Sequence, residues 1–166
     1  MDLEKDDFRT VLDDVRARHA AVVALLYFTD TQALALFRLY ATLAIAAGSG
    51  AAAVFASSTA PRALGWGLAA AMMMLVAGMW FCIEALRSRP ISLPGRGPDF
   101  WLWAARPDIT RDAAFKAYLE TLASKTLENV ETNRINGIAY QRAKLCSLAV
   151  PPMALVGCGV ALWLGL

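Results

Sequence analysis

Apolar residues are concentrated in three segments of the chain, at 35–56, 63–86 and 145–166. Each segment is about 20 residues long, and a helix of that length crosses the roughly 30 Å hydrocarbon core of a bilayer. The hydrophobic fraction of the whole chain, 58%, exceeds the roughly 45–50% of ordinary soluble domains. The pattern therefore predicts an all-α integral membrane protein with three transmembrane helices.

Residues 1–32, which precede the first apolar segment, follow an amphipathic helical pattern. Apolar side chains recur at intervals of three and four, while Asp13, Arg16 and Arg18 lie largely off that face. The segment begins with acidic residues, which is not typical of helices that lie on a membrane surface. We expect a helix that packs against the other soluble helix of the chain. Its apolar face consists of Phe8, Val11, Leu12, Val15, His19, Val22, Val23 and Leu26.

Proline and glycine mark the boundaries of the remaining segments. Thr110 is expected to cap the helix that follows it, and Pro151 and Pro152 are expected to break or kink the last helix. The predicted segments are a cytoplasmic amphipathic helix (1–32), a transmembrane hairpin with a tight loop near 57–64 (33–86), an irregular cytoplasmic loop rich in proline and glycine (87–111), a cytoplasmic helix (112–144) and a third transmembrane span (145–166).

The distribution of basic residues predicts the orientation of the chain. Arg62 is the one basic residue in the hairpin loop, and no basic residue follows Lys144. Because loops rich in Lys and Arg stay on the cytoplasmic side, the N-terminus and residues 87–144 are expected in the cytoplasm. The hairpin tip and the C-terminus are then expected on the opposite, periplasmic side.

Candidate catalytic and metal-binding residues are few. The net charge of +2 is spread along the chain, so we expect no nucleic-acid partner. Cys82, Cys146 and Cys158 lack the spacing of a metal or redox motif and are expected to be packing residues, and no cofactor is predicted. His19, the single histidine, is expected to be packed and hydrogen-bonded rather than to act as a base. No serine or cysteine lies in a nucleophile motif, and we predict that the protein is not an enzyme.

Phe100, Trp101 and Trp103 form an aromatic group within the predicted loop. Tryptophan is enriched where a protein crosses the membrane–water interface, and we expect these rings to lie there. The alternative is an aromatic clamp around a ligand.

Three asparagines lie on one face of the helix that leads into the third span: Asn129, Asn133 and Asn136. Asparagine is costly to bury unless it is hydrogen-bonded. One interpretation is that the row forms hydrogen bonds with the N-terminal helix or a neighbouring subunit, or that it is simply exposed to solvent. The other is a ligand pocket, because carboxamides can bind the edges of a nucleobase.

An ion pair is predicted across the hairpin, between Arg38 and Glu84. The two residues lie 23 positions before and after Pro61, counted as 61 − 38 and 84 − 61. Two antiparallel helices of equal rise would put them at the same depth near the cytoplasmic mouth of the membrane. An unpaired charge is costly within the bilayer, which favours a pair.

The stretch "YFTDTQALALFRLYATL" resembles the entry to the first span in the Pycsar effector family, small membrane effectors of bacterial anti-phage signalling. In that family an amphipathic helix leads to an Asp-x-Lys-Ala-x-x-Leu-like motif, and here Asp30, Gln32, Ala33 and Leu36 occupy its positions, with glutamine in place of lysine. The order of a span pair, a Pro/Gly loop, a helix and a last span is also similar.

The resemblance implies a sensor of a cyclic pyrimidine nucleotide that disrupts the bacterial inner membrane during infection. It implies a ligand site bordered by Asp30, Gln32, Asn129, Asn133 and Asn136.

Small residues recur at every fourth position in the first and third apolar segments, and such faces let helices approach closely in lipid. They are expected to pack within one chain or to form the interface of a homo-oligomer. The rival function is therefore an accessory subunit of a larger membrane complex, of the respiratory or photosynthetic type.

Overall fold

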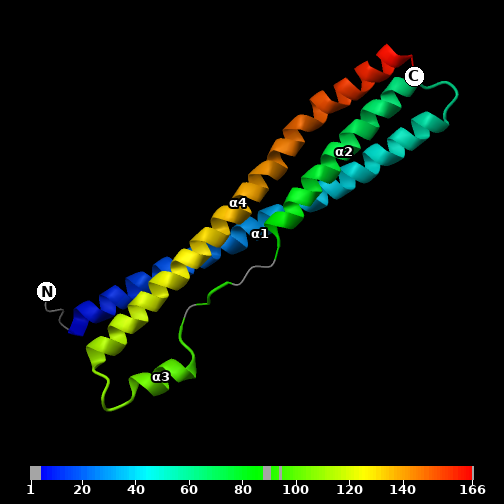
Figure 1. Cartoon of the computed structure of the whole chain (residues 1–166). Helices are drawn as coiled ribbons and strands as arrows, with labels where there is room; N and C mark the ends of the chain where they lie inside the picture. The colour runs from blue at the N-terminus through cyan, green and yellow to red at the C-terminus, as the bar shows by residue number, and fades with distance from the viewer. Residues whose placement is uncertain (1–4, 88–90, 94, 166) are drawn as a thin grey trace. The chain divides into compact units, whose positions relative to one another are not determined.

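The computed structural model describes residues 5–87, 91–93 and 95–165, with side chains from Arg9 onward. Within these residues the chain forms helices and no strands, as Figure 1 shows. The prediction of an all-α protein is confirmed. The helices are α1 (Lys5–Ala56), α2 (Arg62–Ala85), α3 (Pro98–Ala104) and α4 (Arg111–Leu164).

Three of these helices, α1, α2 and α4, are long and apolar enough to cross a membrane. The chain divides into two compact units. The first unit consists of residues 1–28 and 88–134, and the second consists of residues 29–87 and 135–166. Helices α1 and α4 contribute residues to both units, and the hairpin helix α2 belongs to the second.

Helix α4 begins where the sequence predicts. The amide of Ala113 donates a hydrogen bond of 3.2 Å to the hydroxyl of Thr110, which satisfies one of the free amides of the first turn. The expected cap is confirmed.

Helix α4 continues through Pro151 and Pro152 to Leu164, so the prolines do not break it, and the alternative of a kink stays a prediction. Each proline removes one backbone hydrogen bond but leaves the remainder of the helical ladder in place. Prolines inside membrane helices are tolerated where neighbouring groups and small adjustments of the backbone satisfy the freed carbonyls.

The loop predicted between the second and third spans contains a short helix. Helix α3 begins with Pro98 at its first position and has Asp99 in its first turn. Proline costs nothing at this position because its missing amide has no intrahelical partner there, and an acidic side chain is favourable near the helix N-terminus. The prolines and glycines of this stretch exclude a long helix, but they allow a helix of seven residues.

Within the second unit, α2 packs antiparallel to the second half of α1, and the C-terminal half of α4 packs beside both (Figure 1). Tyr40 is 1% exposed, and its hydroxyl donates a hydrogen bond of 2.6 Å to the carbonyl of Ala143. The ring of Tyr40 lies against Gly78, where a Cβ atom would come within 2.6 Å of it. Cys82 is fully buried in the same core, which confirms its expected role as a packing residue.

Glycine also sets the contact between α2 and α4. A Cβ atom at Gly157 would lie 2.8 Å from the carbonyl oxygen of Trp66 and 3.2 Å from Cα of Gly67. Ala161, one turn further along α4, is 2% exposed. The small-residue face of the third span therefore packs within the chain at these positions.

The two residues of the predicted ion pair both lie in the second unit. Glu84 forms an ion pair with Arg87, one turn along the chain, at 3.7 Å. Arg38 lies on an exposed position of α1, and its carbonyl accepts a hydrogen bond from Thr42. The pairing of Arg38 with Glu84 stays a prediction.

Candidate functional site

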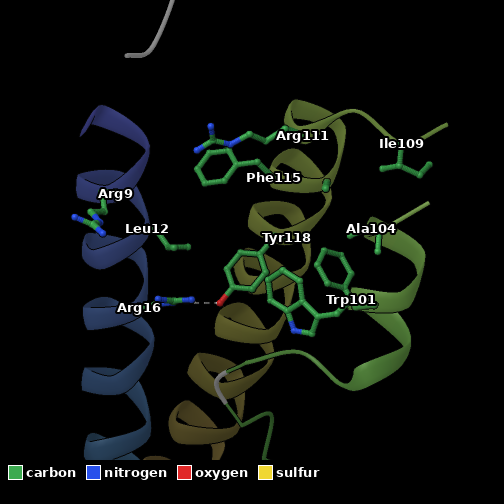
Figure 2. A pocket seen from close by; sticks show the side chains of 12 residues that line it. Arg9, Leu12, Arg16, Trp101, Ala104, Ile109, Arg111, Phe115 and Tyr118 are labelled. Carbon is green, nitrogen blue, oxygen red and sulfur yellow. Dashed lines mark hydrogen bonds between the residues drawn. The ribbon is translucent and has the colours of Figure 1, made fainter. Parts of the chain in front are cut away.

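A partly open pocket of about 850 Å³ lies in the first unit, where α1, α3 and the start of α4 meet (Figure 2). Its volume is in the range of pockets that hold small molecules, roughly 300–1,000 Å³. The residues that line it are Arg9, Leu12, Arg16, Phe100, Trp101, Ala104, Ala105, Ile109, Arg111, Ala114, Phe115 and Tyr118.

The charged side chains of this pocket are all positive. Arg9 and Arg16 come from α1, and Arg111 comes from the first turn of α4. No aspartate or glutamate is among the described residues that line the pocket. Three arginines among the residues that line one cavity favour an anionic occupant, since guanidinium binds carboxylate or phosphate through paired, charge-assisted hydrogen bonds.

Aromatic side chains line the pocket together with the arginines. Trp101 lies beside Tyr118, with ring centroids 6.3 Å apart, and Phe100 packs at 5.4 Å from Trp103. Figure 2 shows Trp101 projecting from α3 toward Tyr118 of α4. Trp101 remains 54% exposed, so one of its faces is available for stacking. The structure thus brings Trp101 and Phe100 to the pocket, and the aromatic clamp and the position at the membrane interface both stay predictions.

Arg16 is held in the pocket by Tyr118. Its Nε donates a hydrogen bond of 3.4 Å to the Tyr118 hydroxyl, drawn as a dashed line in Figure 2. The guanidinium also lies 5.8 Å from the centroid of the same ring, within the range of a cation–π interaction. One cation of the pocket is therefore oriented before any ligand arrives, and its terminal nitrogens are not used by this hydrogen bond.

His19 lies buried beyond the pocket, further along α1. It is fully buried, and its Nδ1 lies 2.9 Å from the hydroxyl of Thr126. Its Nε2 donates a hydrogen bond of 3.0 Å to the carbonyl of Ser92. The prediction of a packed, hydrogen-bonded histidine is confirmed, and so is the packing of the first part of α1 against the part of α4 that belongs to the first unit. The side chain of Phe8, which the sequence assigns to the same face, lies outside the described residues.

The predicted asparagine row is divided between the two units. In the first unit, Asn129 is fully buried and exchanges two hydrogen bonds with the main chain of Ser92. Asn133 is half-buried in the same unit. In the second unit, Asn136 is 5% exposed, and within the described residues its Oδ1 has no hydrogen-bond partner. Asn129 thus has a structural partner, and the ligand role of the row stays a prediction.

The other two predicted ligand residues lie on α1 in the second unit. Asp30 is half-buried. Gln32 is exposed, and its Oε1 accepts a hydrogen bond of 3.4 Å from the hydroxyl of Tyr140 on α4. Neither residue lines the arginine pocket of the first unit.

Sequence reasoning missed the three arginines of the pocket. Arg9, Arg16 and Arg111 look like ordinary solvated charges, because Arg111 lies about a hundred residues from the other two and all three are off the apolar faces of their helices. One signal in the sequence could have indicated the pocket. The aromatic group of 100–103 is followed by Phe115 and Tyr118, and so many rings in a loop and the helix after it suggest that they pack together.

No model of a protein family matches the chain, and no curated protein or solved structure matches it. Its class follows from its own structure: an all-α protein with three helices suited to cross a membrane. Within the described residues, no group of three or more histidine, cysteine, aspartate or glutamate side chains is arranged to hold a metal ion.

Proposed function

We propose that the protein is a membrane effector that senses a small anionic ligand with a planar ring, of the cyclic nucleotide class, and responds by disrupting the inner membrane. The observation that carries this proposal is the pocket of the first unit, which joins three arginines to an aromatic wall. This pocket replaces the asparagine row as the site where we expect the ligand to bind.

The two kinds of side chain in the pocket match the two parts of such a ligand. Arg9, Arg16 and Arg111 bind the phosphate, and Trp101 stacks on the base. Stacking of a base on an aromatic side chain contributes about 1–3 kcal/mol, and a hydrogen bond to a charged group contributes about 1.5–3 kcal/mol. Both contributions are opposed by the loss of translational and rotational freedom on binding.

The pocket and the candidate spans are parts of the same helices. Helix α1 carries Arg9 and Arg16 near its start and a candidate span near its end, and α4 likewise carries Tyr118 before its apolar half. A ligand that changes the packing of α1 against α4 in the first unit therefore acts on helices that enter the bilayer. The protein is a multi-pass protein of the bacterial inner membrane in this proposal, and it acts as a homo-oligomer.

Binding is tested by thermal unfolding of the purified protein in the presence of the four common 3′,5′-cyclic nucleotides. A bound ligand at 100 times its dissociation constant stabilises the folded state by about 2.7 kcal/mol, so the melting temperature of the first unit is expected to rise by several degrees. Inorganic phosphate and the uncharged nucleosides are the controls, because each supplies only one part of the ligand. Equal shifts with the controls, or no shift with any cyclic nucleotide, would contradict the proposal.

Disruption of the membrane is measured separately, as release of a trapped dye from anionic lipid vesicles that contain the protein. The cyclic nucleotide that raises the melting temperature is expected to accelerate release. A ligand that binds without changing release would remove the effector part of the proposal and leave the binding part.

The proposed orientation is tested with a membrane-impermeant maleimide in intact cells. A cysteine in place of Thr59, at the hairpin tip, is expected to react from the periplasm. A cysteine in place of the exposed Asp108 is expected to react only after the cells are opened. The parent chain is the control, because its own cysteines lie in α2 and in the later part of α4. The reverse pattern of labelling would refute the orientation.

A subunit role in a larger membrane complex is the second candidate. It is favoured by large apolar side chains that remain exposed in the first unit, notably Leu102 at 70% and Leu127 at 67%. Gentle purification separates the two functions. Recovery of a particle that contains only this chain supports the effector, whereas stable co-purification with other membrane subunits supports the alternative.

A further inference from the structure

Ser92 lies on the connection between α2 and α3, and its main chain is bound by two buried side chains. The amide of Ser92 donates a hydrogen bond of 3.0 Å to Oδ1 of Asn129, and Nδ2 of Asn129 donates one of 2.9 Å to the Ser92 carbonyl. The same carbonyl accepts the hydrogen bond from His19. The carboxamide of Asn129 thus pairs with a peptide group as a neighbouring β-strand would.

The two side chains that bind Ser92 are held firmly themselves. His19 and Asn129 are both fully buried, and the second ring nitrogen of His19 lies against Thr126. The hydroxyl of Thr126 also lies 2.7 Å from the carbonyl of Leu122, one turn earlier in α4, so its single proton is shared between that carbonyl and His19. A buried polar network in which each group has a partner is rigid, because each hydrogen bond that breaks leaves an unsatisfied group in a medium of low dielectric constant.

Helix α3, by contrast, buries none of its own side chains. It has seven residues, no side-chain cap and no buried residue. Its first residue, Pro98, follows Ser92 by six positions, counted as 98 − 92. Between them, Arg96 donates a hydrogen bond of 3.1 Å to the carbonyl of Ala117 and lies 4.5 Å from the centroid of the Phe100 ring. The attachment of α3 to α4 therefore combines these contacts, made just before the helix begins, with the ring contacts of Phe100 and Trp101 against Tyr118.

We propose that His19 and Asn129 are positioning residues, which form with Ser92 a latch that holds α3 and its Trp101 as the wall of the pocket. Neither side chain lines the pocket, so they act on a ligand only through the position of α3. If α3 is already fixed in position, ligand binding does not have to order it. The entropic cost of binding is then smaller, and the affinity is higher. The effect on affinity rests on the proposed function, but the effect on the order of α3 does not.

The test is hydrogen–deuterium exchange of the α3 amides in the full-length protein. Replacing Asn129 with alanine is expected to accelerate exchange of the amides from Phe100 to Ala105 by at least tenfold, because α3 loses its attachment. Exchange in the neighbouring part of α4, around Leu122, is expected to change less than threefold. Arg134→Ala is the control, since it removes side-chain hydrogen bonds to Glu131 on the same helix that reach neither Ser92 nor the Ala117 carbonyl.

Unchanged exchange of the α3 amides in Asn129→Ala would overturn the latch, and so would equal acceleration throughout the first unit, which would indicate a merely structural role. Should the alanine variant fail to fold, Asn129→Leu provides the same test with the volume preserved. In a second arm, the affinity for the cyclic nucleotide that binds the parent is expected to fall about tenfold. If the parent binds no cyclic nucleotide, the proposed function fails while the exchange result still decides the latch.

Discussion

Replacing Gly157 with alanine is expected to lower the free energy of unfolding of the second unit by about 1–3 kcal/mol, the usual cost of inserting a methyl group into a packed core. The new Cβ atom would lie 2.8 Å from the Trp66 carbonyl oxygen and 2.9 Å from Cβ of Ala70. One neighbour is a backbone oxygen and the other is a Cβ atom fixed to the backbone, so no flexible side chain can move to relieve the contact. Helices α2 and α4 would have to separate.

Gly159→Ala is the matched control, two residues further along the same helix. A Cβ atom at Gly159 meets no atom within 4 Å. Alanine favours the helix over glycine by roughly 1 kcal/mol at either position, so the difference between the two variants isolates the contact between α2 and α4. Reversible unfolding in mixed detergent measures both. If the two variants are equally stable, or if Gly157→Ala changes only the oligomeric state, the packing of α4 on α2 is wrong.

The fold could be predicted from the sequence wherever local chemistry decides it. Three apolar segments, each about long enough to cross a bilayer, indicated helices suited to span a membrane. Thr110 indicated where α4 begins, and the apolar face that contains His19 indicated how the first part of α1 packs. Local chemistry did not reveal that the predicted helix 112–144 and the third predicted span form one continuous helix, α4. Pro151 and Pro152 break isolated helices, but tertiary packing and a membrane environment tolerate them.

The candidate site could be predicted only in part, because it is assembled from residues distant in sequence. The asparagine row was recognised as unusual, and Asn129 does serve a specific contact, but its partner is the main chain of Ser92. A periodicity analysis of one helix does not reveal a partner in a loop. The same limit applies to the pocket, since α3 brings Trp101 to Tyr118 only after the chain has folded back.

Replacing Arg16 with glutamate is expected to weaken binding of the anionic ligand by at least a hundredfold. The change removes a guanidinium that Tyr118 orients in the pocket and puts a carboxylate beside the remaining cations, Arg9 and Arg111. Loss of a hydrogen bond to a charged group costs about 1.5–3 kcal/mol, and repulsion of the ligand adds to it. Each 1.4 kcal/mol corresponds to a factor of ten in the dissociation constant.

Arg18→Glu is the control for this change, because Arg18 is exposed on the same helix, does not line the pocket and alters the net charge equally. Isothermal titration at moderate salt measures both variants with the cyclic nucleotide that stabilises the parent. Arg18→Glu is expected to weaken binding less than threefold, since the charge of an exposed side chain outside the site is screened within about 10 Å at 0.1 M salt. Equal losses in the two variants would mean that the ligand responds to overall charge and does not occupy this pocket.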